Sequence, residues 1–323
     1  MTANGIKIVF GGGAFQSGSA ADAIEWVKVL EEVGIKTIDT AMIYGQSEEI
    51  LGQVGAASRF IVDTKLPGGF GPELSTQDHV VKTCNASLGR LQTDVVDVYY
   101  IHAPDRRVPI KETLMGLNEL HKKGAFKRLG LSNFLSEEIE EVVRVAKENS
   151  FIVPSVYQGN YSAAARRIEQ EVIPTLRRHN IALYAYSPIA GGFLTKSKDA
   201  IIGAKEGRFS QSHPWSNVYS SLYHRPAFLS ALDMWDQISQ DEGITKAELA
   251  YRWAFYHSKL QGDLGDAIVI GARTHDQLKE TALAVQNGPL RSAAVDRIDQ
   301  FWDTIKDEAL LDNFEASQQE KGS

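Results

Sequence analysis

Short runs rich in β-branched residues alternate along the chain with longer segments whose apolar residues recur at helical spacing. The short runs predict strands, and the longer segments predict amphipathic helices. The eight predicted strands are Ile6–Phe10, Lys36–Asp39, Arg59–Thr64, Val95–Ile101, Phe126–Leu131, Pro154–Gln158, Ile181–Tyr186 and Ala267–Ile270. The predicted helices are Ala20–Val33, Ser47–Val54, Thr76–Arg90, Lys111–Lys123, Ser136–Asn149, Ile168–His179, Thr245–His257 and His275–Gln286.

This alternation predicts a parallel α/β sheet. Eight strand–helix units in about 280 residues match a closed (β/α)8 TIM barrel better than an open doubly wound sheet. The first strand runs into Gly11-Gly12-Gly13, but Ala14-Phe15-Gln16 does not complete a GxGxxG fingerprint, which weakens the Rossmann alternative. We therefore expect one barrel domain over residues 1–323.

The repeat is interrupted at two places. Gly191–Arg225 is predicted to be a long loop after the seventh strand, and loops of this length in a compact domain often cover a functional site. Beyond the eighth unit, Ala293–Leu311 predicts an extra helix that packs on the barrel or closes its mouth. Ser136 and Thr245 precede acidic residues, so we expect both hydroxyls to cap helix N-termini.

Composition narrows the range of partners. Lys and Arg number 34 against 41 Asp and Glu, which gives a net charge of −7. We expect no binding to nucleic acid or to anionic membranes, because a mildly acidic protein does not attract them. Cys84 is the one cysteine, so no internal disulfide is possible and a cytoplasmic location is expected. No apolar run reaches the roughly 18 residues of a membrane span, and Met1–Lys7 lacks a signal-peptide pattern.

Four polar residues close to the ends of predicted strands form a candidate catalytic group. Catalytic side chains of such barrels stand at the C-terminal strand ends, where Asp39, Tyr44, Lys65 and His102 are found. A lysine ammonium lowers the pKa of a neighbouring phenol, and a carboxylate such as Asp39 supplies the counter-charge that a buried lysine needs. Tyr44 and His102 would contact a carbonyl substrate. The group suits proton delivery to an oxygen, so the electron pair must come from a cofactor; we expect no metal.

Other interpretations remain open for these residues. Taken singly, His102 is typical of a core histidine, Lys65 of a surface charge and Ser132-Asn133 of a helix cap. One alternative function is a regulatory subunit of the same fold that binds the cofactor with little turnover. Another is a sugar-phosphate isomerase or an aldolase, in which Lys65 would form a Schiff base. The tyrosine and the Ser132-Asn133 motif favour hydride transfer, and fold alone does not decide.

Several motifs together carry a family resemblance. They are Ile38-Asp39-Thr40-Ala41, Tyr44-Gly45-Gln46-Ser47-Glu48, Asp63-Thr64-Lys65, Tyr100-Ile101-His102-Ala103-Pro104-Asp105 and Gly130-Leu131-Ser132-Asn133-Phe134. Over nearly its whole length the sequence resembles the aldo-keto reductase family, and Val156–Tyr161 and Pro188–Thr195 are similar to its aflatoxin-aldehyde reductase branch. The resemblance implies a (β/α)8 barrel and NADPH-dependent reduction of an aldehyde or ketone. It implies that Tyr44 is the acid, that Lys65 and Asp39 tune it, and that His102 orients the carbonyl.

The resemblance also implies a cofactor site. Residues at the ends of strands five and six would hold the carboxamide, Tyr186 would stack on the nicotinamide, and Ser187 through Lys196 would wrap the pyrophosphate with help from Arg208. The segment from Gly271 through Lys279 would hold the adenosine end. The implied contacts are Ser132, Asn133, Gln158, Tyr186, Ser187, Pro188, Ile189, Gly191, Gly192, Leu194, Lys196, Arg208, Gly271, Ala272, Arg273 and Gln277.

Two positions depart from the family pattern. Gln277 stands where an arginine often binds the 2′-phosphate, and Arg273 is the nearest replacement. The substrate-loop pattern Tyr-Arg-Asn-Arg is Tyr219-Ser220-Ser221-Leu222 here. Tyr219 and Leu222 are expected to line the substrate pocket, and loss of the second arginine predicts a neutral carbonyl, aromatic or from secondary metabolism. A homodimer stays open.

Overall fold

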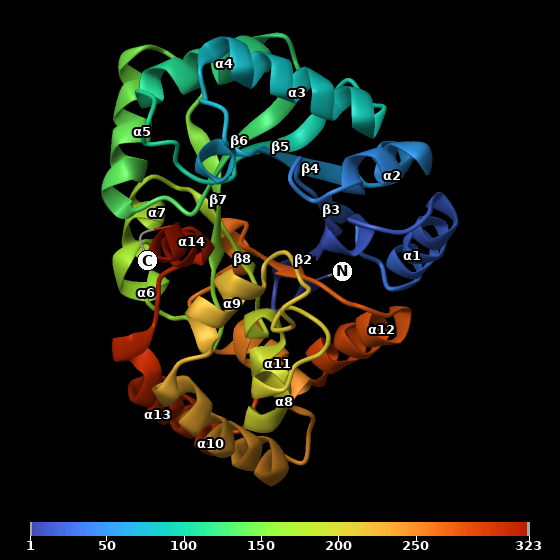
Figure 1. Ribbon diagram of the computed structural model, residues 1–323, viewed down its shortest axis with the longest axis vertical. Helices are drawn as coiled ribbons and strands as arrows, with labels where there is room; N and C mark the ends of the chain where they lie inside the picture. Colours follow the sequence, from blue (N-terminus) through green and yellow to red (C-terminus); the bar gives the residue numbers. More distant parts are fainter. Residues whose placement is uncertain (1, 322–323) are drawn as a thin grey trace.

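Strands and helices alternate through the part of the chain that the computed structural model describes, residues 2–321 (Figure 1). The strands are β1 (Thr2–Ala3), β2 (Ile6–Gly11), β3 (Thr37–Asp39), β4 (Ile61–Leu66), β5 (Val96–Ile101), β6 (Phe126–Ser132), β7 (Pro154–Asn160), β8 (Ala182–Tyr186) and β9 (Ala267–Ile270). The helices are α1 (Ala20–Glu32), α2 (Ser47–Gln53), α3 (Gln77–Leu91), α4 (Ile110–Lys122), α5 (Ser136–Glu148), α6 (Ile168–Glu171), α7 (Ile173–Arg178), α8 (Lys198–Ile202), α9 (Ser216–Tyr223), α10 (Pro226–Glu242), α11 (Lys246–Tyr256), α12 (His275–Ala284), α13 (Ser292–Ile305) and α14 (Asn313–Lys321).

Strands β2 to β9 form a closed parallel barrel. Each pairs in parallel with the next, and β2 also pairs with β9 through Lys7↔Ala267 to Phe10↔Ile270. The short β1 adds an antiparallel hairpin to β2. All eight predicted strands are present, which confirms the TIM barrel. Closure puts the C-terminal ends of eight strands around one mouth.

The apolar periodicity of the sequence corresponds to two layers of packing. Apolar faces of the helices and the outward faces of the strands form one large core, in which Trp26, Val27 and Leu30 of α1 take part. A smaller cluster fills the inside of the barrel, with Val9, Val98, Val156, Val269 and the rings of Tyr100 and Tyr184. Burial of this apolar surface stabilises the fold by about 25 cal/mol per Å².

The predicted long loop Gly191–Arg225 contains more structure than expected. A 3-10 segment at Ala190–Thr195, α8 and α9 lie within it. The prediction was wrong here because α8 and α9 are short, and the apolar period is hard to detect over so few residues. The prediction also missed α10, although Pro226 at its first turn and Gly243 with φ 67° at its end are ordinary start and stop signals.

Two other helix predictions need correction. The helix expected at Ile168–His179 is divided into α6 and α7, because Pro174 lacks an amide hydrogen and cannot continue a helix. Thr245 caps α11 as predicted by accepting the Glu248 N–H at 3.1 Å. Ser136 is instead the first residue of α5, and its hydroxyl donates to the carbonyl of Glu171 at 2.5 Å.

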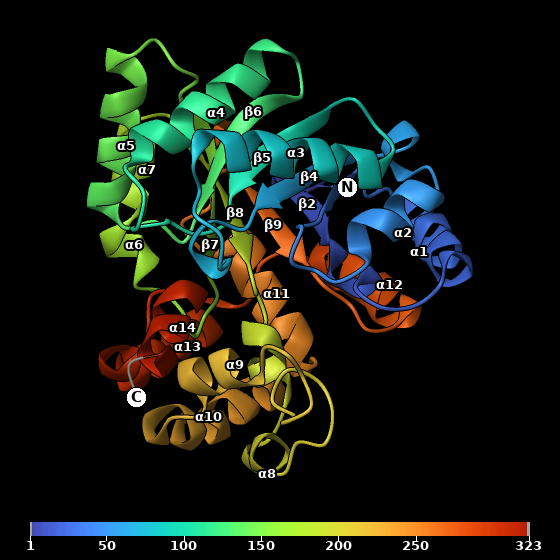
Figure 2. The ribbon, with the colours of Figure 1, turned by 45° about the horizontal axis from the view of Figure 1, so that its top comes forward.

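The C-terminal segment closes one side of the barrel mouth. The predicted extra helix is present as α13, which lies along α10, and a further helix, α14, follows it and lies against α9 (Figures 1 and 2). Within residues 2–321, none of the helices is both long enough and apolar enough to cross a bilayer.

Candidate active site

A buried ion pair joins the ends of β3 and β4. The Lys65 ammonium donates to Asp39 Oδ2 at 2.6 Å and to the Thr40 carbonyl at 2.7 Å. The lysine side chain is 0% exposed and the aspartate 2%. From β7, Gln158 Nε2 donates to the second oxygen of Asp39 at 3.0 Å. A buried pair is tolerated when such hydrogen bonds satisfy its remaining polar atoms.

Tyr44 lies beside this pair, with the Lys65 Nζ atom 5.2 Å from the centre of its ring. Burial raises the pKa of the Tyr44 phenol above 10, and the Lys65 charge opposes this effect. The sequence predicted a net lowering, which is not observed because burial is the larger effect. Burial alone would lower the pKa of Lys65, but Asp39 and Tyr44 more than offset it and the pKa is raised. At neutral pH the site therefore holds a phenol and an ammonium.

The imidazole of His102 packs against Tyr44. Their ring centroids are 5.7 Å apart at an interplanar angle of 75°. Burial, and secondarily the Lys65 charge, holds the pKa of His102 well below its usual 6.5, so the ring is neutral. Its Nδ1 atom has no hydrogen-bond partner among residues 2–321. A neutral imidazole next to a phenol can hold a polar group of a substrate by a hydrogen bond.

Three residues implied as cofactor contacts share one network with His102. Asn133 Nδ2 donates to the His102 carbonyl at 2.9 Å and to Ser132 Oγ at 3.1 Å, and the Tyr186 hydroxyl donates to Asn133 Oδ1 at 2.7 Å. Asn133 has a φ of 60°, a left-handed conformation that asparagine tolerates better than most residues. The Asn313 N–H donates to the Tyr186 hydroxyl at 3.3 Å, which links α14 to the network.

The segment that follows β8 has a run of left-handed residues. Ser187, Ala190, Gly191 and Gly192 have φ values of 55°, 53°, 65° and 99°. A Cβ on Gly191 would lie 2.1 Å from the Tyr219 ring, so only glycine fits against that ring. Within this turn the Ala190 and Gly192 N–H groups already donate to the Ser187 and Ile189 carbonyls. A turn of this kind can present its remaining backbone N–H groups to an anion.

Two implied ligand contacts pack beside this segment. The Tyr219 hydroxyl lies 3.1 Å from Ser187 Oγ, and the Arg208 guanidinium stacks on the Tyr219 ring at 4.6 Å from its centre. The structure thus brings a cation from later in the interval Gly191–Arg225 close to the left-handed turn. A turn of this kind with an arginine beside it fits a diphosphate, which carries negative charge and many acceptor oxygens.

A second cationic position lies at the start of α12. Thr274 caps the helix by accepting the Gln277 N–H, and Gln277 Oε1 accepts the Arg273 N–H at 3.0 Å. The Arg273 side chain is 62% exposed and lies 3.7 Å from Glu206. Helix N-termini attract anions, so the exposed guanidinium and the helix end together fit a phosphate group.

Other implied residues are buried in the core. Leu222 is 1% exposed and Leu194 is 0% exposed, and both belong to the apolar core. The Leu194 carbonyl accepts from the indole of Trp235 at 2.8 Å. Contacts of these two residues with ligands stay predictions.

Sequence reasoning missed two aromatic residues near the site. Phe70, in the segment after β4, makes edge-to-face contacts with His102, Trp215 and Phe314 at centroid distances of 5.2, 5.7 and 5.3 Å. Aromatic residues in loops are usually interpreted as packing. Phe314 lies near the far end of the chain, where no pattern connects it to β4.

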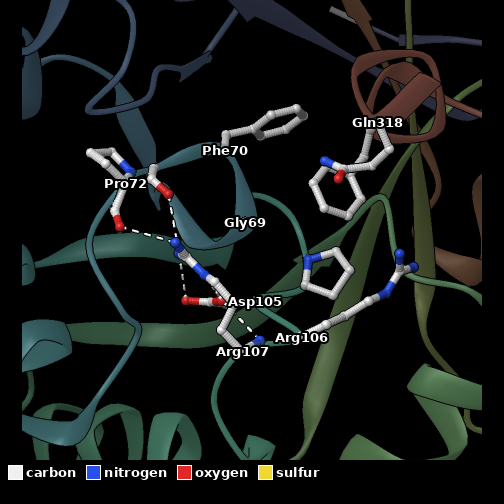
Figure 3. A pocket seen from close by; sticks show the side chains of 10 residues that line it. Gly69, Phe70, Pro72, Asp105, Arg106, Arg107 and Gln318 are labelled. Carbon is white, nitrogen blue, oxygen red and sulfur yellow. Dashed lines mark hydrogen bonds and ion pairs between the residues drawn. The ribbon is translucent and has the colours of Figure 1, made fainter. Parts of the chain in front are cut away.

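A surface pocket adjoins Phe70 (Figure 3). It has a volume of about 360 Å³, and the segments after β4 and β5 line it together with α14. Arg107 closes one side, where it bonds to Asp105 and to the Pro72 carbonyl, while Gln318 and Arg106 lie on the other side. Phe70 lines this pocket and also contacts His102, so its ring lies between the two.

Comparison with known proteins agrees with the geometry. The family model described as the aldo/keto reductase family matches residues 7–303. The chain is 37% identical to oxidoreductase sirO of Leptosphaeria maculans, over 88% of this chain and 87% of that protein. It is 37% identical to aflatoxin B1 aldehyde reductase member 2 of Rattus norvegicus, over 87% and 80%. It is 36% identical to aldo-keto reductase family 7 member A3 of Homo sapiens, over 92% and 94%.

Proposed function

The chain belongs to the aldo/keto reductase family, and we propose that it uses NADPH to reduce an aldehyde or ketone, with Tyr44 as the proton donor. Membership implies carbonyl reduction with a reduced nicotinamide cofactor. The observation that carries the finer proposal is the buried Asp39–Lys65 pair next to Tyr44 and His102. A phenol, an ammonium and a neutral imidazole meet where a carbonyl oxygen would gain charge.

The four residues have complementary roles in this proposal. The bound cofactor supplies a hydride to the carbonyl carbon. Tyr44 donates its hydroxyl proton to the carbonyl oxygen, and Lys65 stabilises the phenolate that this leaves. Asp39 keeps Lys65 charged in a buried position. His102, being neutral, orients the same carbonyl oxygen by a hydrogen bond and does not compete for the proton.

The cofactor proposal rests on the polar strand ends and the two cationic positions. Ser132, Asn133 and Gln158 would hold the carboxamide, and the half-buried Tyr186 would offer its ring to the nicotinamide. The segment Ser187 to Lys196, with Arg208, would hold the pyrophosphate. Gly271, Ala272, Arg273, Gln277 and the start of α12 would hold the adenosine phosphate. The exposed Arg273 guanidinium is the feature that favours NADPH over NADH.

For the substrate we propose a neutral, aromatic carbonyl. The Phe70 ring lies beside His102 and the Trp215 ring lies beside Phe70, and both offer flat apolar contacts. Several relatives are named as reductases of aflatoxin B1 aldehyde. Tyr44 and His102 would contact the carbonyl directly, with Tyr219 and Leu222 behind them.

A substrate panel tests the proposal. Purified protein is mixed with neutral aromatic, aliphatic and carboxylated aldehydes, with NADPH or NADH, and loss of the nicotinamide absorbance is followed. We expect the highest kcat/KM for aromatic aldehydes with NADPH. Tight NADPH binding without turnover of any aldehyde would contradict the proposal and would indicate a cofactor-binding regulatory protein instead.

A further inference from the structure

A second aspartate lies inside the barrel directly beside the catalytic ion pair. Asp63 of β4 is the ladder partner of Asp39 on β3, and it precedes Lys65 by two residues, so both side chains of β4 face the barrel interior. Its side chain is fully buried. Asp63 Oδ1 accepts the Val98 N–H at 2.9 Å, whereas Oδ2 has no hydrogen-bond partner among the described residues.

Two carboxyl groups thus face one ammonium. Both hydrogen bonds that Lys65 makes go to Asp39 and the Thr40 carbonyl, and neither goes to Asp63. A second cation near Asp63, the guanidinium of Arg128 on β6, bonds to Asp97 at 2.6 Å and to the Tyr184 hydroxyl at 3.2 Å. Each cation near Asp63 is therefore already paired with another carboxylate.

Apart from the Val98 N–H and the already paired cations Lys65 and Arg128, the neighbours of Asp63 do not stabilise a negative charge. The titratable or charged groups that face it are Asp39 of β3, Lys65 of β4, Asp97 and Tyr100 of β5, Arg128 of β6 and Tyr184 of β8. The Tyr100 ring lies across Gly130, where a Cβ would meet it at 2.2 Å, and its hydroxyl has no partner among residues 2–321. Val9, Val156 and Val269 cover the other strands of the interior.

An unpaired buried carboxylate is unfavourable, and a second one beside Asp39 is more so. Burial, with the neighbouring Asp39 charge, accordingly raises the pKa of Asp63 to about 8. At neutral pH the carboxyl is protonated, and above pH 8 its O–H bond breaks and the proton passes to solvent. The interior then carries one more negative charge next to Lys65.

We propose that Asp63 is a positioning residue that sets the net charge around the Asp39–Lys65 pair and thereby controls how readily Tyr44 gives up its proton. The inference rests on the proposed function of Tyr44. As a neutral acid, Asp63 leaves one carboxylate opposite one ammonium. When ionised, it opposes formation of a phenolate at Tyr44, because like charges repel in a poorly solvated interior. The reverse reaction, alcohol oxidation, needs that phenolate as a base and is restrained most.

The first experiment compares pH profiles of wild-type protein and Asp63→Asn. Asparagine keeps an acceptor for the Val98 N–H and cannot ionise. Alcohol oxidation with NADP⁺ and aldehyde reduction with NADPH are measured between pH 6 and pH 10. Without the added charge, we expect the rising limb of oxidation in Asp63→Asn to begin at a pH about one unit lower than in the wild type. The falling limb of reduction should move in the same direction.

Glu48→Gln is the matched control. Glu48 is also a buried carboxylate, but it lies on α2, outside the barrel interior, and pairs with Arg90 at 2.6 Å. The same chemical change there should leave both pH limbs where they are in the wild type. Identical profiles for wild type and Asp63→Asn, or an equal displacement in Glu48→Gln, would overturn the proposal.

A second measurement does not depend on activity. Between about pH 4 and pH 8 folded protein holds a proton on Asp63 that the unfolded chain has released, so stability falls as pH rises in this window. The unfolding equilibrium constant of the wild type should therefore rise, relative to Asp63→Asn, by about tenfold per pH unit. An equal pH dependence in both proteins would show that Asp63 holds no such proton.

The two measurements separate the possible failures. If the protein has no reductase activity but shows the expected stability difference, the proposed function is contradicted. The conclusion that Asp63 is protonated in the folded protein is then still supported. If Asp63→Asn does not fold, titration of the ¹³C-labelled aspartate carboxyls of wild-type protein by NMR replaces the stability test. A carboxyl that titrates near pH 8 is expected, and its absence would overturn the inference.

Discussion

Lys65 Nζ lies 2.6 Å from Asp39 Oδ2, and both side chains are almost completely buried. Neither charge can be removed without leaving the other in a poorly solvated interior. Because the lysine also lies beside the Tyr44 ring, the pair connects a feature needed for stability with the group that delivers the proton.

Replacing Tyr44 with phenylalanine removes the hydroxyl with little change in volume. We expect kcat for aldehyde reduction to fall by about 10²- to 10⁴-fold, the range for loss of a general acid. The Kd for NADPH, measured by fluorescence quenching, should change less than twofold. Tyr256→Phe is the control, because the hydroxyl of Tyr256, on α11, donates to the Val285 carbonyl and takes no part in the hydrogen bonds described for the site. A near-normal kcat in Tyr44→Phe would exclude Tyr44 as the donor.

Lys65→Met removes the ammonium and keeps the length of the side chain. The Lys65 charge opposes the effect of burial on Tyr44, so the pKa of Tyr44 should rise further in the variant. Alcohol oxidation requires the ionised phenol, and its rising limb should therefore move to more alkaline pH. Reduction near neutral pH should fall sharply, since the phenolate is no longer stabilised. A variant with good turnover and the pH profile of the wild type would show that Lys65 has only a structural role.

The sequence predicted those parts of the site that lie at the ends of buried strands. Asp39, Lys65, Ser132 and Gln158 are all found there, because period-two patterns define a strand and a barrel brings its strand ends together. The hydrogen bonds among these side chains could be identified only in the structure. Asp63 was visible only as part of a motif, since no sequence pattern shows that its second oxygen lacks a partner.

The sequence did not predict the structure of segments in which apolar residues show no clear helical or strand period. The interval Gly191–Arg225 contains short helices whose apolar faces are too brief to detect. Leu222 is buried in the apolar core, so Leu222→Arg would bury a charge and is a poor test of substrate preference, and its expected contact with a substrate stays a prediction. Phe314 reaches Phe70 only because α14 returns to the barrel mouth.

The neutral state of His102 gives a prediction for stability. Its folded-state pKa lies well below 6.5. Below pH 6.5, His102 of the unfolded chain therefore binds a proton that it does not bind in the folded protein. Stability is therefore lost as pH falls below 6.5, by up to about 1.4 kcal/mol per pH unit. Because Asp63 contributes the opposite slope over the same range, the test is a difference. Between pH 5 and pH 6.5 the free energy of unfolding, measured with denaturant, should rise with pH by up to about 1.4 kcal/mol per pH unit more in the wild type than in His102→Gln. The exposed His224 supplies the control, His224→Gln, which should behave like the wild type; equal slopes in all three proteins would contradict a neutral His102.

Arg273 is the proposed partner of the 2′-phosphate. Arg273→Ala should weaken NADPH binding by about 1–3 kcal/mol, the range for charge-assisted hydrogen bonds, and should leave NADH binding nearly unchanged. Arg59→Ala is the control, because Arg59 is a comparably exposed arginine that pairs with Glu31. Isothermal titration with both cofactors measures the difference. Equal losses of binding free energy for NADPH and NADH would show that Arg273 contacts a part of the molecule that the two cofactors share.

The last prediction concerns Phe70, which the sequence did not single out. Its ring contacts His102 on one side and Trp215 on another, so a flat substrate with its carbonyl at His102 would lie against it. Phe70→Ala removes this surface without touching the proton donor. We expect KM for aromatic aldehydes to rise about two- to tenfold, as for loss of one aromatic contact, with a smaller change in kcat.

A short aliphatic aldehyde is the internal comparison, because it does not extend far enough to use the ring. Its KM should change little in Phe70→Ala. Leu74→Ala is the matched control, since Leu74 lies in the same segment and is 47% exposed. A fall in kcat for both aldehydes with KM unchanged would mean that Phe70 acts only by holding His102 in place, and the proposed aromatic substrate would lose its main structural support.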